Sequence, residues 1–401
     1  MIKKIIAAAV ASFLLTASVF TPNAVAAPKS VAAKKIEKLF PVPDAEGLIA
    51  SGTSLITFSN TGGANSNVVV TSFDLLGTTL WQLTIDSGVD EVATAAFTDT
   101  SGDIWLAGSA ALAFTLIESA TAASSAENPD GVLLEPLVPL RADMNQLALW
   151  KISSTGELLE TFTSEQSTTP LVDNISVNDS GISIIGKMQE RSFLINSSLT
   201  GVMGKALFIG SSKTNLTSVV RSSDGSVNVF GDSSETLAGK KLAGIRDGIL
   251  VKVSKSGAIK SLVRSSALKG NRSWLSADAN FTLTGFVKVR KNIESAITRF
   301  NSSFAPLWTV RYPSNGNSRL IASGNKSHVA IGSTSAIKGI KGWRPREPQL
   351  LVLSFDRKGR LLAATGSADL VSASSLAYSK EIGLFGIATA RDSSLHIFKA
   401  G

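Results

Sequence analysis

The sequence predicts an all-β fold made of repeated strand units, and three observations support this prediction. A strand, turn and strand at residues 91–110 (EVATAAFTDTSGDIWLAGSA) recur along the chain, with Gly102 in the turn, where glycine tolerates the positive φ that tight hairpins need. A glycine in the second strand of most copies marks a period of 45 to 54 residues. Each pair is followed by a third segment that alternates apolar and polar residues, as half-buried strands do.

The marker position defines seven copies of this unit: Ser59, Gly108, Gly186, Gly231, Gly285, Gly332 and Gly386. One interval, of 78 residues, is longer because it contains an insertion at residues 111–145. A turn and a fourth strand follow in each copy, and two of these strands carry Leu-Trp at the same offset, at Trp81 and Trp308. Four strands with a period near 45 residues are typical of propeller blades. We therefore expect a single β-propeller of about seven four-stranded antiparallel blades over residues 27–401.

The two ends of the chain are expected to have separate roles. Residues 1–26 combine Lys3 and Lys4, an apolar run and a final Ala-Val-Ala, the pattern of a signal peptide. An uncleaved membrane anchor is the alternative, but the apolar run is shorter than the ~20 residues that span a bilayer. We predict a secreted protein, extracellular or in the cell envelope, without membrane insertion after cleavage. Residues 35–42 (KIEKLFPV) are predicted to supply the strand that the last copy lacks and so to close the ring.

The composition excludes several kinds of site. The chain has no Cys, which rules out disulfides, thiolate metal sites and cysteine nucleophiles. Its two histidines, His328 and His396, are too few for an ordinary zinc site. Phosphate-loop, dinucleotide, zincin and nucleophile-elbow motifs are absent, and Asp in the turns fits hairpin chemistry better than calcium binding. We expect no catalytic residues, no metal, no cofactor and a monomer.

Charge is distributed unevenly along the chain. Residues 1–200 hold 10 Lys and Arg against 20 Asp and Glu, whereas residues 201–401 hold 29 against 11. The second half is therefore strongly basic, which bears on the partners of the protein rather than on its fold. Nucleic acid is not expected as a partner, because no DNA- or RNA-binding motif accompanies the charge.

Three long segments join second to third strands, at residues 111–145, 232–246 and 333–348, and in a propeller such loops lie on one face. The last two are basic. We predict a ligand-binding surface formed by Lys240, Lys241, Arg246, Lys338, Lys341, Trp343, Arg344 and Arg346. An indole beside guanidinium groups can stack on or pair with planar or anionic ligands. The expected partner is an anionic envelope polymer or an acidic protein surface, and a solvated basic surface without a ligand is the alternative.

The alternating strands, the Asp or Ser plus Gly turns, the Leu-Trp strands and the Asp-x-x-Gly-x-hydrophobic-x-x-x-Gly pattern resemble secreted bacterial β-propellers with quinoprotein-like (PQQ-like) repeats. The resemblance covers most of the mature chain through generic blade motifs. It implies a ring of antiparallel blades, and only some members of that family bind pyrroloquinoline quinone. This chain lacks the vicinal cysteine pair that several of those enzymes have. We therefore predict an exported, non-catalytic binding or scaffolding module, with a quinoprotein-like or sugar-acting enzyme with an axial site as the alternative.

Overall fold

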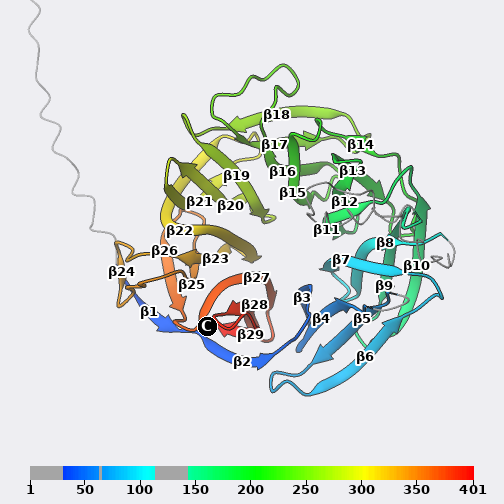
Figure 1. Cartoon of the computed structure of the whole chain (residues 1–401), viewed down its shortest axis with the longest axis horizontal. Coiled ribbons are helices and arrows are strands. Elements are labelled where there is room, and N and C mark those ends of the chain that lie inside the picture. The colour runs from blue at the N-terminus through cyan, green and yellow to red at the C-terminus, as the bar shows by residue number, and fades with distance from the viewer. Residues whose placement is uncertain (1–29, 63–65, 113–142) are drawn as a thin grey trace, which may run out of the picture.

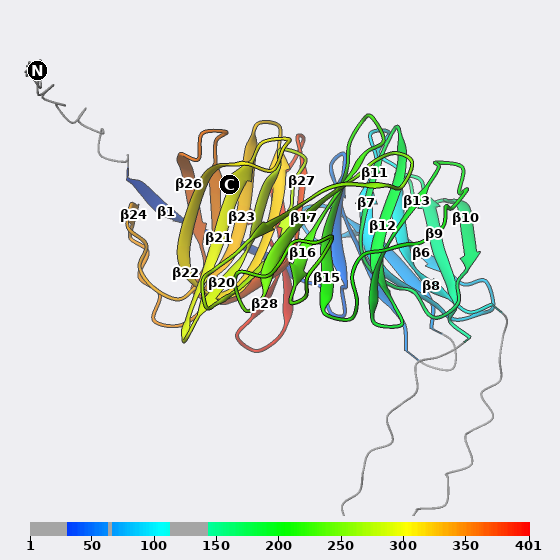
Figure 2. The same ribbon diagram turned by 90° about the horizontal axis from the view of Figure 1, so that it is seen from above.

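The protein is an all-β propeller, a ring of sheets around a central axis (Figure 1). The computed structural model describes residues 30–62, 66–112 and 143–401, and every regular element in them is a strand. Figure 2 shows the strands crossing the thickness of the ring. In this part of the chain no helix is long and apolar enough to cross a membrane. The expected signal peptide at residues 1–26 and most of the insertion at residues 111–145 lie outside the described residues.

Five sheets have four antiparallel strands each. The first contains β3 (Gly47–Ser51), β4 (Ser54–Asn60), β5 (Val68–Phe73) and β6 (Thr79–Ile85). The second contains β7 (Glu91–Thr98), β8 (Ile104–Ala110), β9 (Gln146–Ile152) and β10 (Leu158–Glu165). The third contains β11 (Leu171–Asn178), β12 (Gly181–Met188), β13 (Arg191–Ser197) and β14 (Leu207–Phe208).

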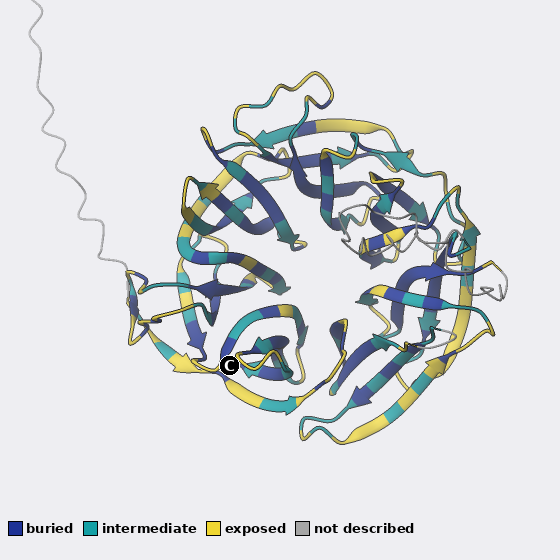
Figure 3. Ribbon diagram, in the orientation of Figure 1, coloured by how far each residue is buried: buried dark blue, intermediate teal, exposed yellow. Residues whose placement is uncertain are grey.

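The fourth sheet contains β15 (Thr214–Arg221), β16 (Val227–Ser233), β17 (Asp247–Val253) and β18 (Ile259–Ser265). The terminal sheet contains β27 (Leu370–Ser379), β28 (Gly383–Ala390), β29 (Leu395–Ala400) and β2 (Glu37–Pro41). In all five sheets the first strand lies near the axis and the last at the rim (Figure 1). The outer strands are correspondingly the more exposed ones (Figure 3).

A sixth, nine-stranded sheet completes the ring. Its strands in order are β19 (Asn271–Ala277), β20 (Thr282–Val289), β21 (Asn292–Phe300), β22 (Pro306–Ser323), β23 (Lys326–Ser333), β25 (Gln349–Phe355), β26 (Leu361–Gly366), β1 (Val31–Lys35) and β24 (Ile340–Lys341). The 18-residue β22 pairs with β21 up to Pro313 and with β23 from Ser314 onwards. The structure therefore has five four-stranded sheets and one larger sheet, where the sequence predicts about seven equal blades.

The C-terminal strand β29 shares a sheet with β2, a strand from near the start of the described chain. Within the segment that the sequence predicts to close the ring, residues 35–42, strand β2 pairs antiparallel with β29, the last strand of the chain. Phe40 of β2 packs against Phe73 of the first sheet, with ring centroids 5.4 Å apart. The preceding strand β1 pairs in parallel with β26, a contact that the sequence does not predict.

The repeated glycine has a steric cause. Where β7 pairs with β8, the register shifts by one residue beside Gly108, and the innermost strand bulges. A Cβ atom on Gly108 would lie 1.8 Å from the carbonyl oxygen of Val92, and one on Gly186 would lie 2.0 Å from that of Leu171. No side chain fits at such distances. The first sheet, which has Ser59 at the marker position, shows no bulge between β3 and β4.

The repeated tryptophans each hold a turn that follows later in the chain. The Nε1 of Trp81 on β6 donates to the carbonyl oxygen of Ser154 in the second sheet at 3.3 Å. That of Trp308 on β22 donates to the carbonyl oxygen of Arg357, in the turn between β25 and β26 of the same nine-stranded sheet, at 3.1 Å. The indole of Trp81 covers Gly156, where a Cβ atom would come within 2.5 Å of the ring.

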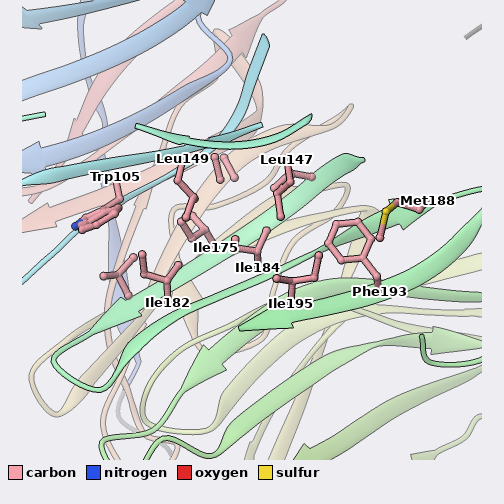
Figure 4. Packing of buried hydrophobic residues seen from close by; sticks show 13 residues of the cluster. Trp105, Leu147, Leu149, Ile175, Ile182, Ile184, Met188, Phe193 and Ile195 are labelled. Atoms are coloured by element: carbon pink, nitrogen blue, oxygen red, sulfur yellow. The ribbon is translucent and has the colours of Figure 1, made fainter. Parts of the chain in front are cut away.

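The core lies between facing sheets. Figure 4 shows one such layer, in which Trp105 and Leu149 of the second sheet meet Ile182 and Ile184 of the third. All four side chains are nearly inaccessible to solvent. Because each sheet buries its apolar faces only against its neighbours, the ring holds the sheets in fixed positions and presents their connecting loops from a rigid frame.

Candidate anion-binding surface

The two basic loops predicted from the sequence lie in different parts of the ring. One joins β16 to β17 in the fourth sheet, and the other joins β23 to β25 in the nine-stranded sheet. Strands β19 to β22 lie between them in the chain, and Figure 1 shows the loops' flanking strands on different sides of the ring. The structure therefore does not bring the two loops into one pocket.

Six of the eight predicted residues are exposed basic side chains: Lys240, Lys241, Lys338, Lys341, Arg344 and Arg346. Within the described part of the chain, none of the six has a carboxylate oxygen within 4 Å. Their charges therefore face solvent without internal compensation, which leaves them available to an anionic partner.

Trp343 is buried, so the prediction that its ring stacks on a ligand is wrong. It is only 7% exposed and belongs to the core cluster of the nine-stranded sheet. Its Nε1 donates to the Oγ of Ser333 at 3.0 Å, and its ring lies against Gly366, where a Cβ atom would come within 2.1 Å. The indole anchors the loop and has no free face for a ligand, because a 15-residue connection needs its own apolar contacts to be ordered.

The pattern IKGIKGWR explains how this loop is held. Ile337, Ile340 and Trp343 are buried at a spacing of three residues, whereas the basic residue that follows each of them is exposed. Gly339 and Gly342 adopt φ of 91° and 79°, which returns the chain to the core after each exposed lysine. This triplet is visible in the sequence and is the signal that separates the anchors from the exposed charges.

Arg246 is the second residue whose environment differs from the prediction. Its Nη1 pairs with Oδ1 of Asp232, a carboxylate that also accepts a hydrogen bond from the Oγ of Ser273 at 2.5 Å. Its side chain is 34% exposed. Arg246 is therefore part of an internal network between the fourth sheet and β19, and its charge is already compensated.

Lys240 and Lys241 line a shallow pocket of about 280 Å³ together with Leu262, Val263 and Arg264 of β18. Arg264 connects the loop to the sheet, since its Nε donates to the carbonyl oxygen of Lys240 at 3.1 Å. Arg264 is not predicted from the sequence, because a single arginine in an alternating strand does not by itself indicate a binding site. Its role appears only where β18 and the loop come together.

A second pocket, of about 340 Å³, lies beside the first and shares Val263 and Arg264 with it. It is bordered by Arg272 of β19 and Arg311 of β22. Burial and the charge of Arg311 lower the pKa of Arg272 to about 10, so this guanidinium still carries its proton at neutral pH. The sequence analysis missed these two arginines as well, because they are 39 residues apart in the chain.

The two histidines lie in different sheets, His328 on β23 and His396 on β29. His328 lies between the Oγ atoms of Ser323 and Ser354, at 2.6 and 2.8 Å. Burial, together with the nearby charge of Lys326, lowers its pKa to about 4. In the described residues there is no cluster of three or more His, Cys, Asp or Glu that could hold a metal ion.

The acidic turn residues cap their own turns. In one example, Asp99 accepts hydrogen bonds from the backbone N–H groups of Ser101 and Asp103, and its other oxygen accepts from Trp105 Nε1 at 3.0 Å. Asp356 likewise accepts hydrogen bonds from the backbone N–H groups of Lys358 and Arg360. The carboxylates are engaged by the backbone, as the hairpin interpretation of these residues predicts.

Comparisons with known proteins do not assign the chain to a family. No family model matches the chain, and no curated protein sequence matches it. Among solved structures, the chain is similar to one in a crystal structure of BBS1N in complex with ARL6DN, soaked with lead. That match has a TM-score of 0.45 and 7% sequence identity, and it covers 92% of this chain and 98% of the other. The assignment of the propeller fold rests on the strand pairing described above.

Proposed function

We propose that the protein is an exported, non-catalytic β-propeller binding module, active outside the cell or in the cell envelope, whose basic loops recognise an anionic envelope polymer or an acidic protein surface. It would act as a monomer, without a cofactor. The observation behind this proposal is the set of six exposed and uncompensated basic side chains on the two loops.

The separation of the loops favours an extended ligand. Two groups of cations on different sheets cannot contact one small molecule, but a polymer or a protein surface can reach both. The anchoring of residues 334–348 through Ile337, Ile340 and Trp343 holds the second group in place before binding, so that less conformational entropy is lost when a ligand binds.

We also infer that the ring consists of seven blades of the quinoprotein-like kind. The pairing of β22 with β21 up to Pro313 and with β23 from Ser314 divides the nine-stranded sheet into two groups. Counting those groups separately gives a blade for each of the seven marker positions in the sequence. On this interpretation β22 is the outer strand of one blade and the inner strand of the next.

Retention on a sulfated polysaccharide column tests the binding proposal. Replacing Lys240, Lys241, Arg344 and Arg346 by Gln should lower the salt concentration needed for elution, because each lost contact reduces the electrostatic affinity. The matched control replaces Lys255, Lys260, Arg357 and Lys358, four exposed cations outside the two loops, and removes the same charge. Equal loss of retention in both variants would mean that only net charge matters, and the proposal would be wrong.

A further inference from the structure

The larger of the two pockets lies between the fourth sheet and β19 to β22, and it has two chemically different ends. The register of β21 and β22 orders its lining: Arg311 comes first, then Thr298 opposite Thr309, then Phe300 opposite Pro306. Basic residues therefore border one end of the pocket and apolar rings the other, with two threonine hydroxyl groups between them. Phe304, in the turn before β22, also lies at the apolar end.

Arg272 is the buried cation of this pocket. It is 5% exposed, and the only hydrogen bond of its guanidinium within the described residues runs from Nη2 to the Oγ1 of Thr298 at 3.2 Å. Its Nε has no partner, and no carboxylate of the described chain lies within 4 Å. Stacking on Trp274, with the guanidinium carbon 4.2 Å from the ring centroid, compensates its charge in part.

The neighbouring arginines add to the positive charge instead of balancing it. Arg264 has a side chain that is 7% exposed, and its Nη1 makes no hydrogen bond, with the nearest carboxylate oxygen, of Asp247, 3.5 Å away. Arg311 is 3.9 Å from Glu294. Arg264 also donates to the carbonyl oxygens of Lys240 and Glu235, and the side chain of Arg311 is 43% exposed. Of the three, only Arg272 is therefore a buried charge without a counter-ion in the described chain, which is costly.

We propose that this pocket binds a small organic anion, whose acidic group pairs with Arg272 and Arg311 and whose apolar part lies against Phe300, Phe304 and Pro306. A planar guanidinium with free N–H donors suits the oxygens of a phosphate, sulfate or carboxylate group. The volume of about 340 Å³ lies within the range of small-molecule sites. This binding does not depend on the proposed recognition of a polymer, because it rests on the buried Arg272, whereas the polymer would contact the exposed side chains of the loops.

Calorimetric titration of the whole protein with phenyl phosphate, benzoate and inorganic phosphate, at constant ionic strength, tests the proposal. We expect at least one of the two aromatic anions to bind at least tenfold more tightly than inorganic phosphate, because only the aromatic anions reach the apolar end. The preferred aromatic anion identifies the acidic group. If neither aromatic anion binds, or if inorganic phosphate binds as tightly as both, the proposal is wrong.

Two variants decide whether the site is the one described. Arg272→Met keeps a long, polarisable side chain over Trp274 and should weaken binding of the aromatic anion at least tenfold. Lys288→Met, on β20 of the same nine-stranded sheet and outside the pocket, removes the same charge and should leave binding unchanged. Equal affinity of Arg272→Met and the wild type would overturn the proposal. Arg272→Met should also keep the wild-type retention on the sulfated column, which separates this site from the polymer-binding surface.

Discussion

Two arginines at neighbouring sheet junctions, Arg221 half-buried and Arg272 buried, show how differently this ring treats a charge that is withdrawn from water. Arg221, at the end of β15, faces the third sheet, and burial lowers its pKa. It donates to the Oγ of Ser180, the Oγ of Ser183, the Oδ1 of Asn196 and the carbonyl oxygen of Ser180, at 2.7 to 3.1 Å. Arg272, at the start of β19, has one hydrogen bond from its guanidinium, to Thr298.

Loss of water alone therefore does not indicate whether an arginine has a structural or a ligand-binding role, and the number of its hydrogen bonds must also be considered. The guanidinium of Arg221 makes four hydrogen bonds, and these offset the loss of water and tie the third sheet to the fourth. Arg272 is more deeply buried and makes only one such bond in the described residues, to the Thr298 hydroxyl group beside a pocket. A structural role follows for Arg221 and a ligand-binding role for Arg272.

The largest effect in this comparison is expected from Arg221→Met. The substitution leaves Ser180, Ser183 and Asn196 without their cationic donor at a sheet junction, so the free energy of unfolding should fall by about 3 kcal/mol. Urea denaturation measures this change. Lys255→Met, at an exposed position in the fourth sheet, serves as the control and should change stability by less than about 0.5 kcal/mol. A loss of stability no greater than in this control would remove the structural role of Arg221.

His328 is a third partly desolvated basic side chain, and unlike the arginines its imidazole is neutral at pH 7. Both ring nitrogens are hydrogen-bonded, and its pKa of about 4 lies below the ordinary 6.5. The unfolded chain therefore takes up a proton first as pH falls, so the stabilising contribution is complete above about pH 6.5 and is lost towards pH 4. Between pH 8 and pH 5 this group should cost about 2 kcal/mol of stability.

Urea denaturation of the wild type and of His328→Phe at both pH values checks this prediction. The Phe variant keeps a ring beside Tyr378, which stacks on His328 with centroids 6.3 Å apart, but it has no proton to gain. Its stability should therefore change less between pH 8 and pH 5 than that of the wild type. Parallel pH profiles for the two proteins would show that His328 is protonated alike in the folded and unfolded chains.

The smallest change in the free energy of unfolding is expected from Arg272→Met, and its sign should be opposite to that of Arg221→Met. Because the charge has no counter-ion, removing it should change the free energy of unfolding by less than about 1 kcal/mol without ligand, and in the stabilising direction. Thermal unfolding without added anions measures it. Destabilisation as large as that of Arg221→Met would mean that Arg272 is a structural residue like Arg221, and the contrast between the two would disappear.

Much of the propeller is visible in the sequence because its causes are local. A bulge in the inner strand forces glycine at positions such as Gly108, so the bulge repeats as a sequence marker. The Leu-Trp pairs recur because the indole NH groups of Trp81 and Trp308 each bind the turn of a strand pair later in the chain. The lysines of the two basic loops are exposed, since their charge keeps them in water, and their role in binding remains a prediction.

The errors have a different origin. Trp343 was expected to contact a ligand because it stands among arginines in the chain, but its three-residue spacing from Ile340 and Ile337 places it in the core. Strand β1 escaped prediction because it pairs with β26, more than 300 residues later in the chain. The sequence also does not predict that β22 joins two groups of strands. This depends on the route that the chain takes from the rim of the ring to its axis, and no local pattern encodes that route.

Periodic residues, hairpin glycines and charge were enough to define an all-β ring with two basic loops, because each of these features acts on its nearest neighbours in the chain. The pairing of Arg246 with Asp232 and the pocket shared by Arg272 and Arg311 appear only in the folded ring. These depend on which sheets meet and how closely, since the dielectric environment and the partners of a charge are set by groups far away in the sequence.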